Sequence, residues 1–198
     1  MMTRKTAVHV AGLLLFMAAA CSGSKAPASK AIAAAQAAYD AVKGDAQKYV
    51  PEKAQTVEEM LTSARTSFDK GDYDAALKAA NTAIPAVNDL SAASAAKKEE
   101  LTRIWADLSN GIPKMVNAIQ SRVNHLSRSK ALPEGMDATE FEGARSGLID
   151  LIRMWSDATI AYKSGNIPSA VTTANMVKDQ AVRIMSNLGM QIPIAAGN

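Results

Sequence analysis

The chain has 198 residues, of which 48% are apolar, 21% charged and 5% aromatic, with one Cys, two His and a formal net charge of +3. This length allows one domain or at most two small ones. The apolar share excludes a disordered chain and a polytopic membrane protein, so a folded chain with a buried core is expected.

The first residues have the pattern of a secretory signal. Arg4 and Lys5 form a short basic region, and residues 7–20 are an apolar run that only His9 and Gly12 interrupt. This run is shorter than the roughly 20 residues that cross a bilayer as a helix. It ends in small residues, as signal peptides do before their cleavage site. We therefore expect residues 1–20 to be a signal peptide and not part of a domain.

Cys21 directly follows three alanines, Ala18 to Ala20. This arrangement resembles the lipobox of bacterial lipoproteins, although Ala18 stands where that family favours Leu. The resemblance implies that the Cys21 sulfur is acylated and that Cys21 becomes the mature N-terminus. The alternative is an ordinary secretory signal cleaved near Ala20, with Cys21 present by chance. Because Cys21 is the only Cys, no intramolecular disulfide can use it, and this favours lipid attachment.

The residues after Cys21 bear on the location of the protein. Ser22, in place of Asp, implies by the same resemblance that the lipoprotein passes to the outer membrane and faces the periplasm. Residues 21–28 are small, flexible and contain Pro27, so we expect them to form a tether between the lipid and the fold. Cleavage before Cys21 would leave 20 basic and 19 acidic residues. This balance gives no reason to expect a nucleic-acid partner.

From residue 26 onward the apolar residues recur at helical spacing, and no stretch alternates as a strand does. We expect an all-α antiparallel bundle over 29–188, built from helical hairpins, and a frayed tail over 189–198. Ile152 and the tryptophans Trp105 and Trp155 are expected on apolar helix faces. The expected helices are 26–41, one from Pro51 to Phe68, one from Tyr73 to Leu90, a long one over 96–128 kinked near Gly111, one from Phe141 to Tyr162, and one from Ala170 to Leu188.

Two segments of the chain begin alike, at Pro51-Glu52 and Pro133-Glu134, and each later turns at a glycine that follows an aromatic residue. A divergent internal duplication would explain this pattern. The alternative is that unrelated helical hairpins commonly begin and turn at the same residue types, without any duplication.

The first hairpin carries two resemblances. Phe68 followed by KGDYDAALKAA resembles the turn of a tetratricopeptide repeat, although the period of that family, about 34 residues, is absent. Over residues 28–92, the Ala-rich helix, the Tyr/Pro/Glu start and the Gly-Asp-Tyr turn resemble a helical domain of unknown function in bacterial lipoproteins. Some members of that family carry an OmpA-like peptidoglycan-binding domain next. Here the following residues are helical, so peptidoglycan binding is not implied.

Catalytic and metal-binding residues are scarce. Beyond Cys21 and the signal segment there is one His, His125, so a Cys-His pair, a His-rich metal site and a redox Cys pair are excluded. We expect no cofactor, no bound metal and no enzymatic activity. His125 is expected to be a partly exposed helix residue. The acidic pair Glu58 and Glu59 is expected on a solvated face, and Asp137 and Glu140 are expected to cap a helix. Asp69, Asp72 and Asp74 lack the remainder of a calcium loop.

These observations favour a lipid-anchored helical protein that has a structural or interaction role in the cell envelope, with the membrane and an envelope protein as partners. The alternative is a tetratricopeptide-like module that binds a peptide or an apolar ligand in a groove between hairpins. The groove would require an exposed apolar patch between helices, whereas a closed bundle would have none.

Overall fold

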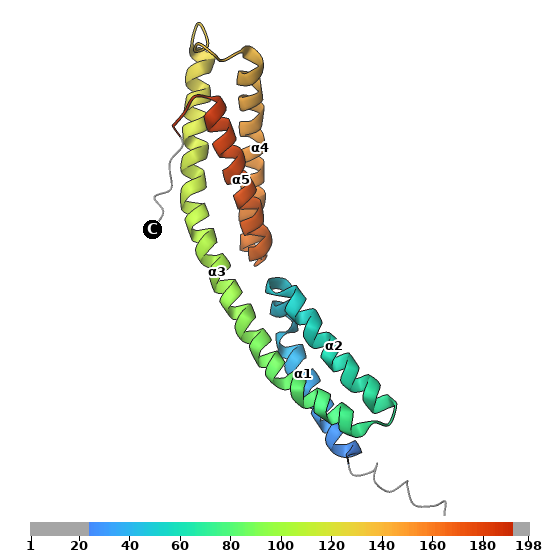
Figure 1. Cartoon of the computed structure of the whole chain (residues 1–198). Coiled ribbons are helices and arrows are strands. Elements are labelled where there is room, and N and C mark those ends of the chain that lie inside the picture. The colour runs from blue at the N-terminus through green and yellow to red at the C-terminus, as the bar shows by residue number, and fades with distance from the viewer. Residues whose placement is uncertain (1–23, 192–198) are drawn as a thin grey trace, which may run out of the picture. The chain divides into compact units, whose positions relative to one another are not determined.

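A computed structural model describes residues 24–191, and within that range the chain is helical, with no strand (Figure 1). The all-α prediction is confirmed. The helices are α1 (Lys25–Tyr49), α2 (Pro51–Asp69), α3 (Tyr73–Arg128), α4 (Ala138–Lys163) and α5 (Ile167–Asn187). Five helices stand where about six are expected, because the segments predicted at 73–90 and 96–128 join into α3. The residues between them are SAASA, which contains neither Gly nor Pro to end a helix.

The chain divides into two compact units. The sequence predicts a helical bundle over 29–188 and leaves open whether it is one unit or two hairpins joined by the long helix. Unit 1 contains the part of α1 up to Lys43 together with Glu52–Leu90, and unit 2 contains Gly44–Pro51 and the chain from Ser91 onward. The helices α1 and α3 therefore contribute residues to both units, while α2 belongs to unit 1 apart from its first residue, Pro51.

Unit 1 packs three helical segments around a core of small side chains. Because alanine has only a methyl group, helices with alanine at their contacts can approach closely. Val57, Leu61, Val87 and Leu90 are buried there as well. The buried aromatic ring of this core is Tyr39 of α1, which crosses to α2, where its hydroxyl donates a hydrogen bond of 3.4 Å to the carbonyl oxygen of Ala54. The buried alanines of unit 1 are Ala28, Ala35, Ala54, Ala64, Ala76, Ala80 and Ala83.

Unit 2 has a core of larger side chains. It is built from the C-terminal end of α1, the later part of α3, and the hairpin of α4 and α5. Its buried residues include Trp105, Ile119, Leu151, Val177 and Leu188. The predicted apolar stripe along α3, from Leu101 to Leu126, is confirmed as part of this core, as expected for a helix that packs one face against its neighbours.

The two helical hairpins turn at glycines in the left-handed backbone region. Gly71 has φ 81 and Gly165 has φ 78, in degrees. Side chains other than glycine rarely adopt such values. Each turn has the same capping hydrogen bonds: the N–H of Asp72 donates to the Ser67 carbonyl, and that of Asn166 to the Ala161 carbonyl, as in the common glycine-containing ends of helices. The glycine stops predicted from the sequence are therefore confirmed.

The two ends of the described range differ from expectation. The expected tether over 21–28 overlaps α1, which begins at Lys25 and whose Ala28 is fully buried. Pro27 is compatible with this helix because proline suits a first helical turn. At the other end, the expected tail over 189–198 begins in ordered structure. The N–H of Met190 donates to the Met185 carbonyl at 2.9 Å, and Met190 packs against the core of unit 2.

Candidate functional site

The predicted lipid-attachment residue, Cys21, lies outside the described residues, as does the expected signal peptide. The first helix of the described range, α1, begins at Lys25. No helix between residues 24 and 191 is long and apolar enough to span a bilayer.

The acidic residues that the sequence singles out have structural partners. Asp137 caps α4: its side chain accepts from the Glu140 N–H at 2.8 Å, and the Glu140 carboxylate accepts from the Asp137 N–H at 3.1 Å. This reciprocal pair is a capping box, and the predicted capping role is confirmed. Asp72 accepts from the Ala75 N–H at 3.1 Å, at the start of α3. In residues 24–191 no group of three or more His, Cys, Asp or Glu side chains is placed to hold a metal ion.

His125 and the pair Glu58 and Glu59 are exposed, as predicted. Glu58 pairs with Lys43 of α1 at 3.1 Å, while Glu59 accepts from Gln55 at 3.0 Å on its own helix. The two carboxylates therefore point to different partners and do not converge on one substrate.

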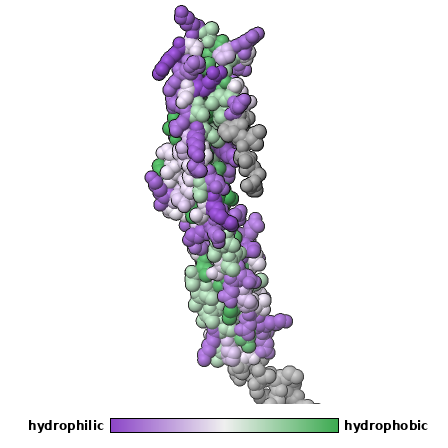
Figure 2. Space-filling view, turned by 90° about the vertical axis from the view of Figure 1, so that its left-hand side faces the viewer, coloured by the Kyte–Doolittle hydropathy of each residue, from purple (hydrophilic) through white to green (hydrophobic). Residues whose placement is uncertain are grey.

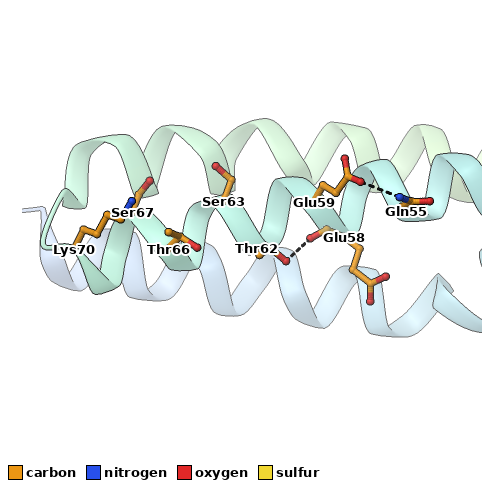
Figure 3. A pocket seen from close by; sticks show the side chains of 8 residues that line it. All are labelled: Gln55, Glu58, Glu59, Thr62, Ser63, Thr66, Ser67 and Lys70. Atoms are coloured by element: carbon orange, nitrogen blue, oxygen red, sulfur yellow. Dashed lines mark hydrogen bonds between the residues drawn. The ribbon is translucent and has the colours of Figure 1, made fainter.

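A polar hollow lies along α2 (Figure 3). All of its lining residues come from α2 and Lys70 just after it, and one helix cannot enclose a ligand. Its carboxylates already have partners, and the Thr62 hydroxyl donates to the Glu58 carbonyl at 2.8 Å. This hollow is open surface without a group poised for chemistry. It is lined by Gln55, Glu58, Glu59, Thr62, Ser63, Thr66, Ser67 and Lys70.

Tyr39 is the buried phenol in the core of unit 1. Burial raises its pKa above the ordinary 10.0, and the carboxylates of Glu58 and Asp40 act in the same direction, while the Lys43 ammonium opposes them. Burial and nearby negative charge both disfavour the charged phenolate. The phenol is therefore neutral at physiological pH and serves as a hydrogen-bond donor.

Three aromatic rings form a stack in unit 2. The Trp105 ring of α3 lies between the rings of Trp155 and Tyr162 of α4, with centroids 5.4 Å and 4.5 Å apart and interplanar angles of 13° and 7°. Trp155 and Tyr162 lie about two turns apart on α4, so Trp105 fills the gap between them. Both tryptophans are predicted on apolar faces, and they do pack in or against the core. The stack itself has no local signal in the sequence, because it depends on how α3 and α4 pair.

An apolar stripe remains exposed on α4. Ile149 is 67% exposed, Ile152 46% and Ile160 62%, and Ser156 lies between them. The fourth large exposed apolar residue in the described range is Met176 on α5, at 55%. Figure 2 shows one face of the molecule, on which hydrophilic and apolar residues are interspersed.

The prediction for Ile152 is wrong, because this residue belongs to the exposed stripe and not to the core. The core face of α4 is set by Leu148, Leu151 and Ala158, which lie one or two positions away from the residues of the stripe. Ile149 and Ile160 are not singled out in the sequence prediction. Their separation along the chain corresponds to about three full helical turns, so both lie on the same face of the helix. This spacing could have predicted a second apolar face on α4.

Comparisons of the chain with family models, curated proteins and solved structures give no match.

Proposed function

We propose that the protein is a lipid-anchored helical lipoprotein that acts as a structural or interaction protein of the cell envelope. In this proposal Cys21 carries the lipid, the chain is held at the outer membrane facing the periplasm, and an envelope protein is its partner. It has no enzymatic role. The proposal rests on one observation, that the apolar run 7–20 ends directly at Cys21, the sole cysteine of the chain.

The start of α1 gives this anchor a geometric consequence. The first residue of α1 is Lys25, four positions after Cys21. An extended chain of that length spans at most about 14 Å. A lipid on Cys21 would therefore hold the N-terminal end of unit 1 close to the headgroups. A tether over the full range 21–28 would have allowed roughly twice that distance.

The anchor is tested by labelling and fractionation in bacterial cells. The wild-type chain should incorporate labelled palmitate and sediment with membranes, and Cys21→Ser should do neither. A matched control combines Cys21→Ser with Ser29→Cys. It keeps one cysteine in the chain but places it inside α1, away from the alanines that end the apolar run, and it should not be labelled. Palmitate-free wild-type protein, or Cys21→Ser that still sediments with membranes, would overturn the proposal.

The outer-membrane location depends on Ser22. Ser22→Asp should retain the labelled protein in the inner membrane, because the family resemblance makes Asp at this position a retention signal. Membrane separation on a density gradient measures this. Equal distribution of wild-type and Ser22→Asp protein would contradict the location while leaving the anchor intact.

A tetratricopeptide-like binding module is the second candidate. The observation that favours it is the edge-to-face contact of Phe68 and Tyr73 around the Gly71 turn, with ring centroids 5.1 Å apart at 63°. Crosslinking in cells followed by mass spectrometry distinguishes the two functions. A defined envelope protein captured by the anchored chain and not by Cys21→Ser supports the first. A spread of peptides captured equally by both forms supports the second.

A further inference from the structure

Unit 1 brings the start of α1 and the turn between α2 and α3 to the same end (Figure 1). The Lys25 ammonium, at the first residue of α1, lies 5.7 Å from the centroid of the Tyr73 ring, at the first residue of α3. The Gly71 N–H donates to the Phe68 carbonyl at 3.0 Å and closes the turn. We call this surface, formed by Lys25, Phe68, Lys70, Gly71 and Tyr73, the turn end of unit 1.

The proposed lipid attachment determines which end of unit 1 lies nearest the membrane. Lys25 is four positions after Cys21, a separation of at most about 14 Å. We infer that the turn end faces the membrane in the anchored chain and contacts the headgroups of zwitterionic phospholipids. This inference rests on the proposed anchor at Cys21, and it adds the orientation of unit 1 and the residues that touch the lipid.

The aromatic residues of unit 1 favour the turn end over its sides as the contact surface. The described part of unit 1 has three of them, and Tyr39 is buried in the core. The other two, Phe68 and Tyr73, both lie at the turn end, are partly exposed, and have ring centroids 5.1 Å apart. Tyrosine has an apolar ring and a polar hydroxyl, and it is enriched where proteins meet the headgroup layer.

The charges of the turn end suit a headgroup that carries both a phosphate and an ammonium group. Exposed lysines and exposed carboxylates lie there together, so each headgroup charge meets an opposite charge on the protein. A purely anionic surface would be repelled by the carboxylates as well as attracted by the lysines. The charged residues are Lys25, Lys70, Asp69, Asp72 and Asp74.

Lysine footprinting tests this orientation without depending on acylation in cells. The chain from Cys21 onward is coupled through its sole thiol to a maleimide-bearing phospholipid in phosphatidylcholine vesicles. A water-soluble acetylating reagent then modifies the lysines, and mass spectrometry gives the rate at each. Compared with the same chain capped by a soluble maleimide, Lys70 should react at least about threefold more slowly, and the exposed Lys53, about 25 Å away along α2, should react equally.

Lys25 is the internal control, because coupling at Cys21 alone brings it to the vesicle surface. Slow reaction at Lys25 with an unchanged rate at Lys70 means that the turn end does not contact the lipid, and it overturns the inference. Equal slowing of Lys53 and Lys70, as for a unit that lies flat on the membrane, overturns it as well.

A matched variant, Cys21→Ser with Lys53→Cys, is coupled to the same vesicles at the opposite end of α2. Lys70 should then react as fast as in the soluble chain. Slowing of Lys70 in this variant too, or slowing that requires vesicles of anionic phosphatidylglycerol, overturns the inference. A chain that shows the expected footprint here but carries no lipid in cells contradicts the anchor and not the contact surface, so the two failures are distinct.

Discussion

The aromatic stack of unit 2 allows a quantitative prediction of stability. Trp105 is 7% exposed, so nearly all of its side chain is removed from water. A tryptophan buries roughly 150–250 Å², and at about 25 cal/mol per Å² this corresponds to about 4–6 kcal/mol. Alanine retains one side-chain carbon, and the unfolded chain already buries part of this area. Trp105→Ala should therefore lower the free energy of unfolding of unit 2 by about 3–5 kcal/mol.

Urea denaturation followed by tryptophan fluorescence measures this loss, since the remaining tryptophan, Trp155, lies in the same unit. Trp155→Ala is the matched control, monitored through Trp105. It removes a half-buried ring that stacks on one side, so its cost should be smaller. Trp105→Phe should recover part of the loss, because a smaller ring still stacks between its neighbours. A cost of about 1 kcal/mol or less for Trp105→Ala, or an equal cost for Trp155→Ala, would refute the reasoning.

Three further features can be tested by substitution. Nothing lies near a Cβ added at Gly143. Gly143→Ala should therefore raise the free energy of unfolding by about 0.5–1 kcal/mol, which is measured as a higher melting temperature. Gly147→Ala should gain less, since its Cβ would lie 2.8 Å from an Ile184 side-chain carbon that must shift. Asp137→Ala should cost about 1 kcal/mol in urea denaturation through loss of the α4 cap, and an unchanged midpoint would contradict that role. The pKa of Tyr39 is raised above 10.0 in the folded chain. The Tyr39 phenol therefore stabilises the folded chain fully at a pH below the pKa that this phenol has in the unfolded chain. This stabilisation is lost as the pH rises through the pKa of the phenol in the folded chain. Tyr39→Phe should flatten that fall, as measured by urea denaturation at alkaline pH.

Periodicity and turn chemistry account for most of the fold that could be predicted. The core stripe of α3, the glycine turns and the Asp137 cap depend on residues close together in the sequence, so local rules suffice. The division of the chain into two units could not be predicted, because the contacts that create it are not local. Pro51 and Pro133 also have different environments. Pro51 is the first residue of α2, whereas Pro133 lies in the connection before α4. Their shared Pro-Glu start therefore does not mark equivalent positions.

The surface features were harder to predict than the core. A stripe of isoleucine has the same spacing whether it faces the core or solvent, and only the packing of α4 on α5 decides between them. For this reason the spacing of Ile152 predicts the wrong face. The stack on Trp105 depends likewise on the register of α3 against α4. This register cannot be predicted from the properties of the individual residues.

The division of α3 between the two units has a consequence for folding. Starting a helix is unfavourable, since the first turn orders several residues for one hydrogen bond, whereas each further residue adds a bond. Unit 2 has the larger side chains in its core, and the small alanines of unit 1 give it less apolar surface to bury. Once α3 has formed in unit 2, it can extend through Ser91 into unit 1 without a second initiation. All residues of α2 from Glu52 onward belong to unit 1. Amide hydrogens of α3 should thus exchange more slowly than those of α2.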